Sequence, residues 1–228
     1  MSVNKVRQAV LLACVAIGMI NSGPTEAADP KSLNAEILDI ANSWGHIKFE
    51  EEDTARQQKE IATLAERASA LIKKYPGRAE PVIWKGVLLS EGASMANEDH
   101  SIFTARSLAY EARDTLLEAE KIDPAALDAG APTSLGVLYY RVPSFPIGFG
   151  DTDLARKYLE EAVRNAPNGM DANYFYGDFL NNQGDHAGAQ RVWKHALTIP
   201  VNTDRPVWDK ARRQVIQENL AKLAAKGN

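Results

Sequence analysis

The side chains able to do acid–base or metal chemistry are scattered along this chain of 228 residues. No two histidines stand four residues apart, as the zinc ligands of a helix do, and no His-Glu-x-x-His motif occurs. Residues 99–101 read Asp-His-Ser, but neighbours in sequence do not converge as the residues of a catalytic triad must. We therefore predict no catalytic residues, no metal site and no cofactor. Surface or helix-cap positions are expected for His46, His100, His186 and His195.

Two further motifs have the composition of ligand sites without the required context. The Gly-Phe-Gly-Asp stretch at 148–151 lacks a following Lys-Ser or Lys-Thr and follows no strand, so it is not a phosphate loop. The acidic run at 50–53 is expected to open a helix, because carboxylates complement the helix dipole. A cation site is the alternative for this run.

Composition and charge are those of an ordinary globular protein. The chain has 26 basic and 30 acidic residues, a formal net charge of −4 and 45% apolar residues. A nucleic-acid-binding surface needs clustered Lys and Arg, so this acidic balance argues against a nucleic-acid partner. The length fits one or two domains.

The first 27 residues are typical of a secretory signal peptide. Lys5 and Arg7 precede an uncharged run at 9–20, which is shorter than the about 20 residues that span a bilayer. Small residues then predict cleavage after Ala27. A retained N-terminal membrane anchor is one alternative, and whether the segment is cleaved stays open.

Cleavage would leave 28–228 as a single domain without cysteine, because Cys14 is the one cysteine of the sequence. A chain without thiols suits an oxidising compartment. The prediction is therefore a periplasmic or secreted protein with no stable membrane span in its mature part. A lipoprotein signal at Cys14 is the second alternative.

An internal repeat dominates the rest of the sequence. Apolar residues recur at steps of three and four, which indicates one buried stripe per helix. Three segments share one pattern: a small residue is followed four positions later by a large one, and three positions after that by another small one. A proline follows each set, and the preceding helix contains a glycine. The small residues let two helices approach closely, and the large one fills the space between them. The sets are Gly86 with Ala112, Leu116, Ala119 and Pro124; Gly136 with Ala155, Leu159, Ala162 and Pro167; and Gly177 with Ala189, Trp193, Ala196 and Pro200.

This pattern resembles the tetratricopeptide repeat (TPR) family, over about 79–200. The third unit has the family spacing, whereas the first two carry insertions, and the signature Trp of the first helix is missing from all three. The resemblance implies an all-α fold, a right-handed superhelix of antiparallel helix pairs with hairpin insertions. Helices near 31–75 would cap one end, and a helix at 206–226 would cap the other. An irregular helical bundle with the same stripes is the alternative.

The insertion at 142–150 is the first candidate binding feature. It holds two prolines, two glycines and two phenylalanines, more apolar than a chain reversal needs. Phe145, Ile147 and Phe149 either pack back on the repeat or contact a ligand or another subunit.

The second candidate is the aromatic and polar face of the first helices. In TPR folds these helices line a concave groove, and Tyr and Asn supply contacts that are both apolar and hydrogen-bonding. Counted from the glycines, the groove positions are Thr133, Val137, Tyr140, Arg141, Asp171, Tyr174, Asp178, Asn181 and Asn182. Of the Lys/Asn/Arg carboxylate clamp of chaperone-binding TPR proteins only Arg141 is present, which excludes that subclass.

The function expected from these features is non-enzymatic: an exported TPR-type protein that binds a protein segment or a small ligand through its groove and the 142–150 loop. Its insertions also weakly resemble the T component of tripartite ATP-independent periplasmic (TRAP) transporters. That resemblance implies a periplasmic solute-binding protein as partner and a homo-oligomer. A scaffold for envelope assembly is a further alternative, and the identity of the partner stays open.

Overall fold

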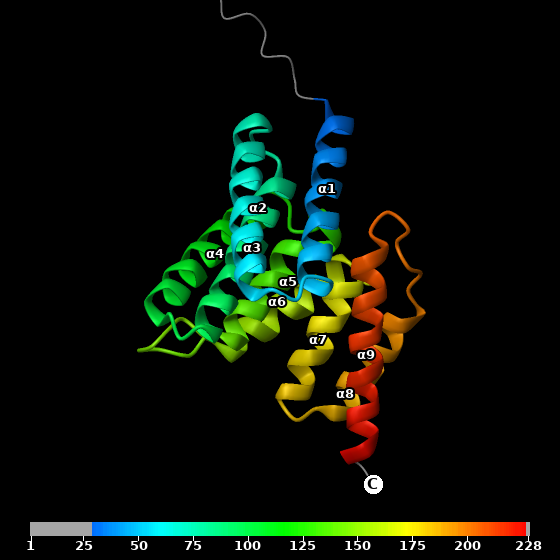
Figure 1. Ribbon diagram of the computed structural model, residues 1–228. Coiled ribbons are helices and arrows are strands. Elements are labelled where there is room, and N and C mark those ends of the chain that lie inside the picture. The colour runs from blue at the N-terminus through cyan, green and yellow to red at the C-terminus, as the bar shows by residue number, and fades with distance from the viewer. Residues whose placement is uncertain (1–28, 227–228) are drawn as a thin grey trace, which may run out of the picture.

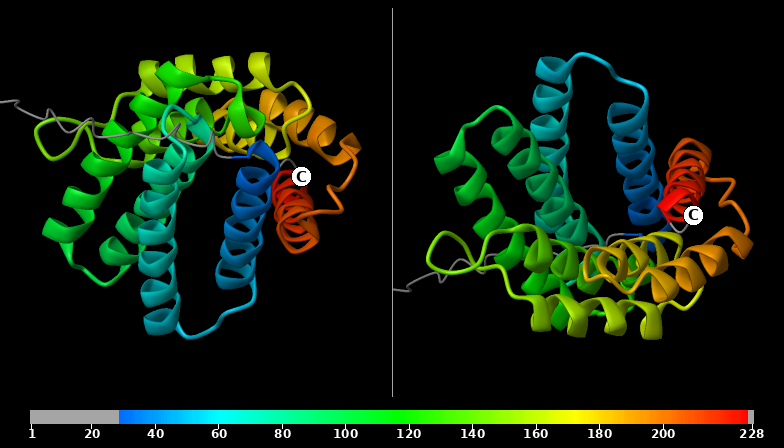
Figure 2. Two further views of the ribbon diagram at one scale, coloured as in Figure 1. Left: turned by 90° about the horizontal axis from the view of Figure 1, so that it is seen from above. Right: turned by 90° about the horizontal axis from the view of Figure 1, so that it is seen from below.

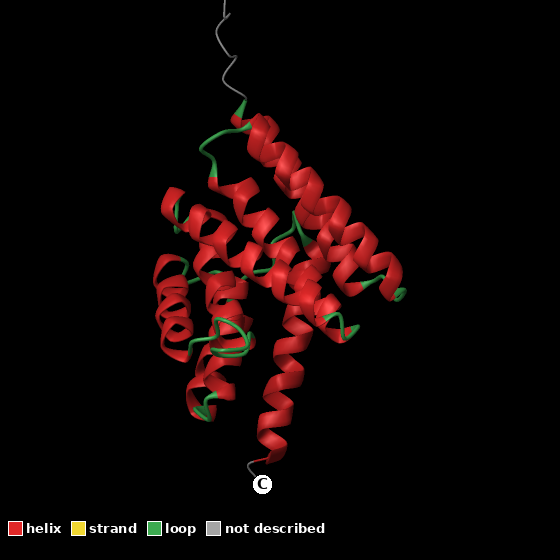
Figure 3. Ribbon diagram, turned by 90° about the vertical axis from the view of Figure 1, so that its left-hand side faces the viewer, coloured by secondary structure: helices red, strands yellow, loops and turns green. Residues whose placement is uncertain are grey.

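Helices account for all the regular elements of residues 29–226, the part of the chain that the computed structural model describes (Figure 1; Figure 3). The predicted signal peptide, with Cys14, lies outside the described residues. The nine helices of this range are α1 (Pro30–Phe49), α2 (Thr54–Lys74), α3 (Ala79–Glu98), α4 (Ile102–Ile122), α5 (Ala126–Arg141), α6 (Thr152–Asn165), α7 (Met170–Asn182), α8 (His186–Thr198) and α9 (Pro206–Lys226). The predicted all-α class is confirmed.

Successive helices pack as pairs, and the glycines of the repeat lie at the contacts within those pairs. Gly86 on α3 packs on Leu116 of α4 so closely that a Cβ there would lie 2.5 Å from its Cγ. Gly136 of α5 has the same relation to Leu159 of α6, and Gly177 of α7 packs on the Trp193 ring of α8. The described helices therefore form an array of sequential pairs, while the right-handed superhelix stays a prediction.

Aspartates set the start of several helices. Asp53 accepts hydrogen bonds from the backbone N–H groups of Ala55 at 2.9 Å and Arg56 at 3.1 Å, so the acidic run does open a helix. Asp151 caps α6 and Asp185 caps α8 in the same way. These three caps stand at the turn of a helical hairpin, and Asp29 caps α1, the first described helix, by accepting from the Lys31 N–H at 3.0 Å.

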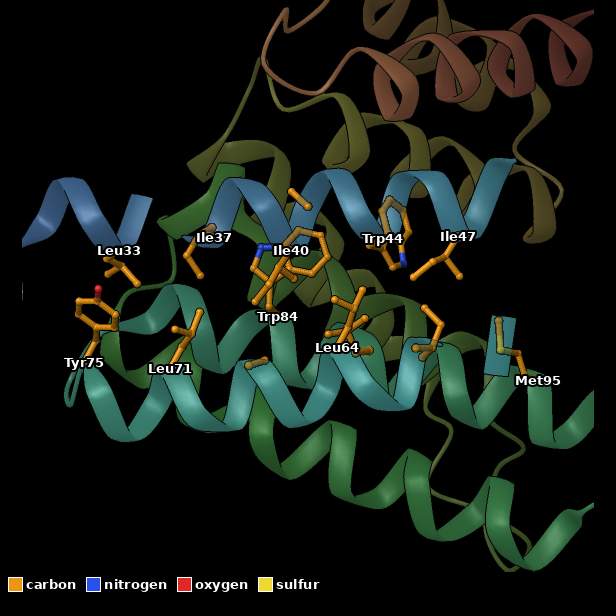
Figure 4. Close-up of a cluster of buried hydrophobic side chains, with 14 residues drawn as sticks. Leu33, Ile37, Ile40, Trp44, Ile47, Leu64, Leu71, Tyr75, Trp84 and Met95 are labelled. Atoms are coloured by element: carbon orange, nitrogen blue, oxygen red, sulfur yellow. The ribbon is translucent and has the colours of Figure 1, made fainter. Parts of the chain in front are cut away.

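The N-terminal pair packs on α3 around a continuous apolar core (Figure 4). Ile37, Ile40 and Trp44 of α1 face Leu64 and other side chains of α2, and Trp84 of α3 belongs to the same cluster. The stripe that predicts α1 is thus its buried face, and α1 lies against α3 as well as α2.

The C-terminal helix returns to the start of the array. Both views of Figure 2 show α9 alongside α1. Gly45 of α1 faces Trp208 of α9: a Cβ on this glycine would lie 3.6 Å from the Trp208 Cβ, an ordinary contact. Asn42 Nδ2 donates to the backbone carbonyl of Asp204 at 3.0 Å. The helix predicted at 206–226 is present, and it contacts α1, α7 and α8.

The start of α5 has an unusual backbone. Leu127, Asp128 and Ala129 have φ values of 51°, 55° and 60°, the left-handed region that disfavours residues with a Cβ. Each such residue costs about 1–2 kcal/mol. The turn is held by burial of Ala129 and by an ion pair from Asp128 to Arg205 at 3.4 Å.

Candidate functional site: a cavity lined by the odd-numbered helices

One large cavity, of about 1200 Å³, lies among α1, α3, α5, α7 and α9. The first turns of α4 and the 142–150 loop complete its wall. Among the described helices, α2, α6 and α8 contribute nothing to the lining. The cavity is therefore a property of the array as a whole, since no single pair of helices encloses it.

Tryptophans form one side of the cavity. The ring of Trp208 lies 4.8 Å from that of Trp44 and 5.8 Å from that of Trp84, measured between centroids, at steep edge-to-face angles. The Arg205 guanidinium lies 4.2 Å from the Trp208 ring centroid. These rings join α1, α3 and α9, so the contact that closes the array also builds an apolar wall.

Three uncharged polar groups of the cavity lining are buried without a hydrogen-bond partner in the described part of the chain. They are the indole nitrogens of Trp44 and Trp84 and the hydroxyl of Thr133. Leaving such a group unpaired costs about 1–3 kcal/mol. The apolar character of the wall is thus maintained at some expense in stability.

The charged side chains of the cavity are mostly paired with one another or with close neighbours. The pairs are Lys48–Glu91 at 2.6 Å, Arg212–Asp171 at 2.6 Å, Arg141–Asp178 at 3.1 Å, Arg205–Asp128 at 3.4 Å, and Glu80 with Arg78. Within residues 29–225, Arg106 and Asp204 are the lining charges that form no ion pair.

Tyr140, Arg141 and Asp178 form one hydrogen-bonded cluster between α5 and α7. The Tyr140 hydroxyl donates to the Asp178 carboxylate, and Arg141 donates to the Tyr140 oxygen at 3.1 Å and to Asp178 at 3.1 Å. Burial raises the pKa of the Tyr140 phenol, which therefore stays protonated and remains a donor. The cluster fixes the arginine side chain at the cavity wall.

A second cluster places Arg212 of α9 against α7. Its guanidinium lies 4.2 Å from the Tyr174 ring centroid and donates to Asp171 at 2.6 Å. Burial also raises the pKa of Tyr174. Arg212 is itself buried, so this pair links the two helices in surroundings where an unpaired charge would be costly.

The nine predicted groove positions fall into three groups. Thr133, Val137, Arg141 and Asp171 line the cavity. Tyr140, Tyr174 and Asp178 lie behind the wall and hold these residues in place. Asn181 and Asn182 lie at the end of α7 outside the lining: the first contacts His186 at 2.9 Å and the second donates to the backbone of Asp178 at 2.8 Å.

The 142–150 loop divides into an anchor and an exposed tip. Phe149 packs edge-on against Tyr110 and Tyr139, with ring centroids 5.0 and 5.6 Å away, and Arg113 lies over its ring. The Phe145 side chain is 88% exposed and Ile147 is 66% exposed. Ile147 lines the cavity, so the loop tip forms part of its rim.

Sequence reasoning missed several residues of the cavity. The tryptophans belong to predicted helices but to no recognised repeat position, and Ile102, Phe103 and Arg106 lie in the first two turns of α4, inside the insertion predicted between Gly86 and Ala112. Phe103 is 91% exposed. A pair of large apolar residues directly after the polar run at 97–101 is the signal that would have pointed to this rim.

The predicted histidine positions agree with roles in local structure. His46 pairs with Glu50, and His195 contacts the Pro167 carbonyl oxygen at 3.0 Å. In the described residues no three His, Cys, Asp or Glu side chains gather as a metal site, and no helix is long and apolar enough to cross a membrane.

Searches of protein-family models and of curated proteins found no match to this chain.

Proposed function

We propose that this protein is a non-enzymatic binding protein that takes up its ligand in the cavity between the odd-numbered helices. The observation that carries the proposal is the cavity itself. Its 1200 Å³ exceeds the about 300–1000 Å³ of pockets for drug-sized ligands, and it combines apolar walls with a few charged groups at fixed positions. The exposed Ile147 at its rim gives the 142–150 loop a part in binding.

A TPR-type array supports this proposal. The glycine-to-large-residue contact recurs in three successive helix pairs, which is the packing that the TPR resemblance implies. The first helices of these pairs, α3, α5 and α7, all contribute to the cavity. In a repeat array the shared inner face is the usual binding surface.

The non-enzymatic part rests on how the reactive side chains are used. Asp99 accepts a hydrogen bond from Gln58, and the neighbouring His100 and Ser101 lie in the turn before α4. The cavity carboxylates are held mainly in ion pairs. Among the described lining residues, the Ser94 hydroxyl donates to the Glu98 carboxylate at 3.4 Å, which is longer than the about 2.6–3.2 Å of an activated nucleophile and its base.

Binding is tested with N-phenyl-1-naphthylamine, a neutral apolar dye whose emission rises when it leaves water. We expect saturable binding of the dye to the wild type. Ser90→Trp places an indole in the cavity and should abolish binding, whereas Ser107→Trp on the outer side of α4 should not. Equal binding by both variants, at unchanged helicity, would refute the proposal.

Export is the second part of the proposal, and it rests on the signal-like segment 1–27. Expression of the full chain in a Gram-negative host should give a periplasmic protein with Ala28 at its N-terminus. N-terminal sequencing of the periplasmic and membrane fractions distinguishes this result from a retained anchor or a lipid-modified Cys14.

A further inference from the structure

The cavity has two lining charges without an ion-pair partner in the described residues, one positive and one negative, and they lie on opposite sides of the molecule. Arg106 is in the second turn of α4, and Asp204 precedes α9, which lies on the opposite side of the molecule (Figure 1). Within residues 29–225 neither forms an ion pair, whereas the other lining charges do. The side of the cavity at α4 therefore has a cation available to a ligand.

Exposed apolar side chains line the same cavity as this cation. Ile102 and Phe103 precede it in the first turn of α4, and Ile147 lines the same cavity from the loop. Their exposed fractions are 54%, 91% and 66%. The Arg106 guanidinium lies over the Tyr110 ring, 5.5 Å from its centroid, and forms no ion pair within residues 29–225. Large apolar side chains exposed to water are unfavourable by themselves, but together with this cation they suit a ligand whose apolar part begins next to its charge.

The wall beyond the rim can continue this apolar contact. Val87 and Val137 line the cavity together with the tryptophans Trp44 and Trp84. The hydroxyl of Thr133 and the two indole nitrogens there have no accessible surface to offer a ligand. An alkyl chain needs no hydrogen-bond partner and can lie along these side chains, whereas a peptide backbone would depend on lining hydroxyl groups of the same helices, those of Ser90, Ser94 and Ser134.

We propose that the cavity binds a single-chain anionic amphiphile, with its charged head at Arg106 and its alkyl chain along the wall formed by Trp84, Val87 and Val137. This inference rests on the proposed binding function and names the ligand class.

The test is displacement of the naphthylamine dye by dodecanoate below its micelle concentration. Dodecanoate should displace the dye from the wild type, and octanoate should be far weaker, because each buried methylene contributes about fourfold in affinity. Dodecyltrimethylammonium has the same chain with a cationic head. If it displaces the dye as well as dodecanoate does, the proposal is wrong.

The matched variants are Arg106→Gln and Arg191→Gln, which remove an exposed guanidinium inside and outside the cavity respectively. We expect Arg106→Gln to weaken dodecanoate about tenfold and to weaken the neutral dye far less, because only dodecanoate has a charge for the guanidinium to pair with. Arg191→Gln should change neither. Equal dodecanoate affinity in both variants would overturn the assignment of the head group.

Two further outcomes separate this inference from the function on which it rests. If the dye binds and Ser90→Trp blocks it, but dodecanoate fails to compete, the binding function holds and the ligand class is wrong. If phosphatidylglycerol vesicles bind the protein while monomeric dodecanoate does not, the exposed rim contacts a membrane surface, and the proposal of a free amphiphile is refuted.

Discussion

Thr133 places a hydroxyl group where its surroundings offer no acceptor. The residue is 4% exposed, and its oxygen has no hydrogen-bond partner within the described residues. A buried hydroxyl that has lost its hydration is a cost to the folded state. The wall of the cavity therefore contains a position where a polar side chain can be replaced with a gain in stability.

We predict that Thr133→Val raises the free energy of unfolding by about 1 kcal/mol, because valine keeps the shape and removes the unpaired hydroxyl. Urea denaturation measures the change. Thr63→Val is the control, since that hydroxyl donates to the Lys59 carbonyl at 3.0 Å, and it should give no gain. A loss of stability in Thr133→Val would mean that the hydroxyl is satisfied.

Leu127 tests the left-handed turn at the start of α5. Leu127→Gly should be more stable than Leu127→Ala by about 1 kcal/mol, because glycine adopts a φ of 51° without a Cβ penalty. Both variants lose the same side chain, so the comparison isolates the backbone. Ser107 on α4, a regular helical position, is the control. There the alanine variant should be more stable than the glycine variant. If the glycine and alanine variants had the same order of stability at both sites, the left-handed geometry of the turn would be contradicted.

At the scale of the elements, the glycines within the helix pairs set how closely two helices approach. Gly136→Ala would bring a Cβ to 2.5 Å from Leu159 Cγ and should lower stability by about 2 kcal/mol. Gly92 of α3 is the matched control, because a Cβ there would lie 3.5 Å from Leu108, an ordinary contact. Gly92→Ala should stabilise by about 0.5–1 kcal/mol. Opposite signs, measured by urea unfolding, are the expected result.

Only one of the three large apolar residues of the 142–150 loop anchors the loop on the helices. Phe149→Ala removes the ring that packs on Tyr110 and Tyr139 and should lower stability by about 2 kcal/mol and speed proteolysis at the loop tip. Phe145→Ala, at a side chain that is 88% exposed, should stay within about 0.5 kcal/mol of the wild type. Unchanged proteolysis of the first variant would show that other contacts hold the loop.

Sequence pattern predicted the elements well because their determinants are local. The stripe through Ile37 and Trp44 and the capping aspartates each act within one helix. The groove positions were harder to predict. Counting from Gly136 and Gly177 identifies the residues that share a helix face, but not the residues of other helices that lie opposite that face. Tyr140 and Tyr174 therefore belong to the face that was predicted, yet they pack against charged neighbours from other helices instead of lining the cavity.

For the whole molecule, the contact between α9 and α1 joins the two ends of the described array. Trp208 packs on Trp44 and Trp84, and Arg205 covers its ring. No periodicity in the sequence predicts this contact, because the residues that form it come from helices far apart in the sequence, α1 and α9. Prediction from repeats treats both ends as independent caps, whereas in the structure they meet.

We predict that Trp208→Ala lowers the free energy of unfolding by about 3 kcal/mol and selectively reduces hydrogen-exchange protection in α9. The α3–α4 pair should keep its protection, because it packs through Gly86 and Leu116. Val207→Ala, a smaller change at a half-buried neighbouring position, is the control. Protection of α9 that matches the wild type would show that α7 and α8 alone hold this helix.

The hydrogen bond between Asn42 and Asp204 joins residues 162 positions apart. Closing a chain segment of that length costs about 4–5 kcal/mol of loop entropy, whereas the helix pairs close over short hairpins. Contacts so distant in sequence also form late in folding. Since synthesis runs from the N-terminus, α1 is the first described helix to be made; its Trp44 can pack on α2 and α3 early, but its contact with Trp208 requires the end of the chain.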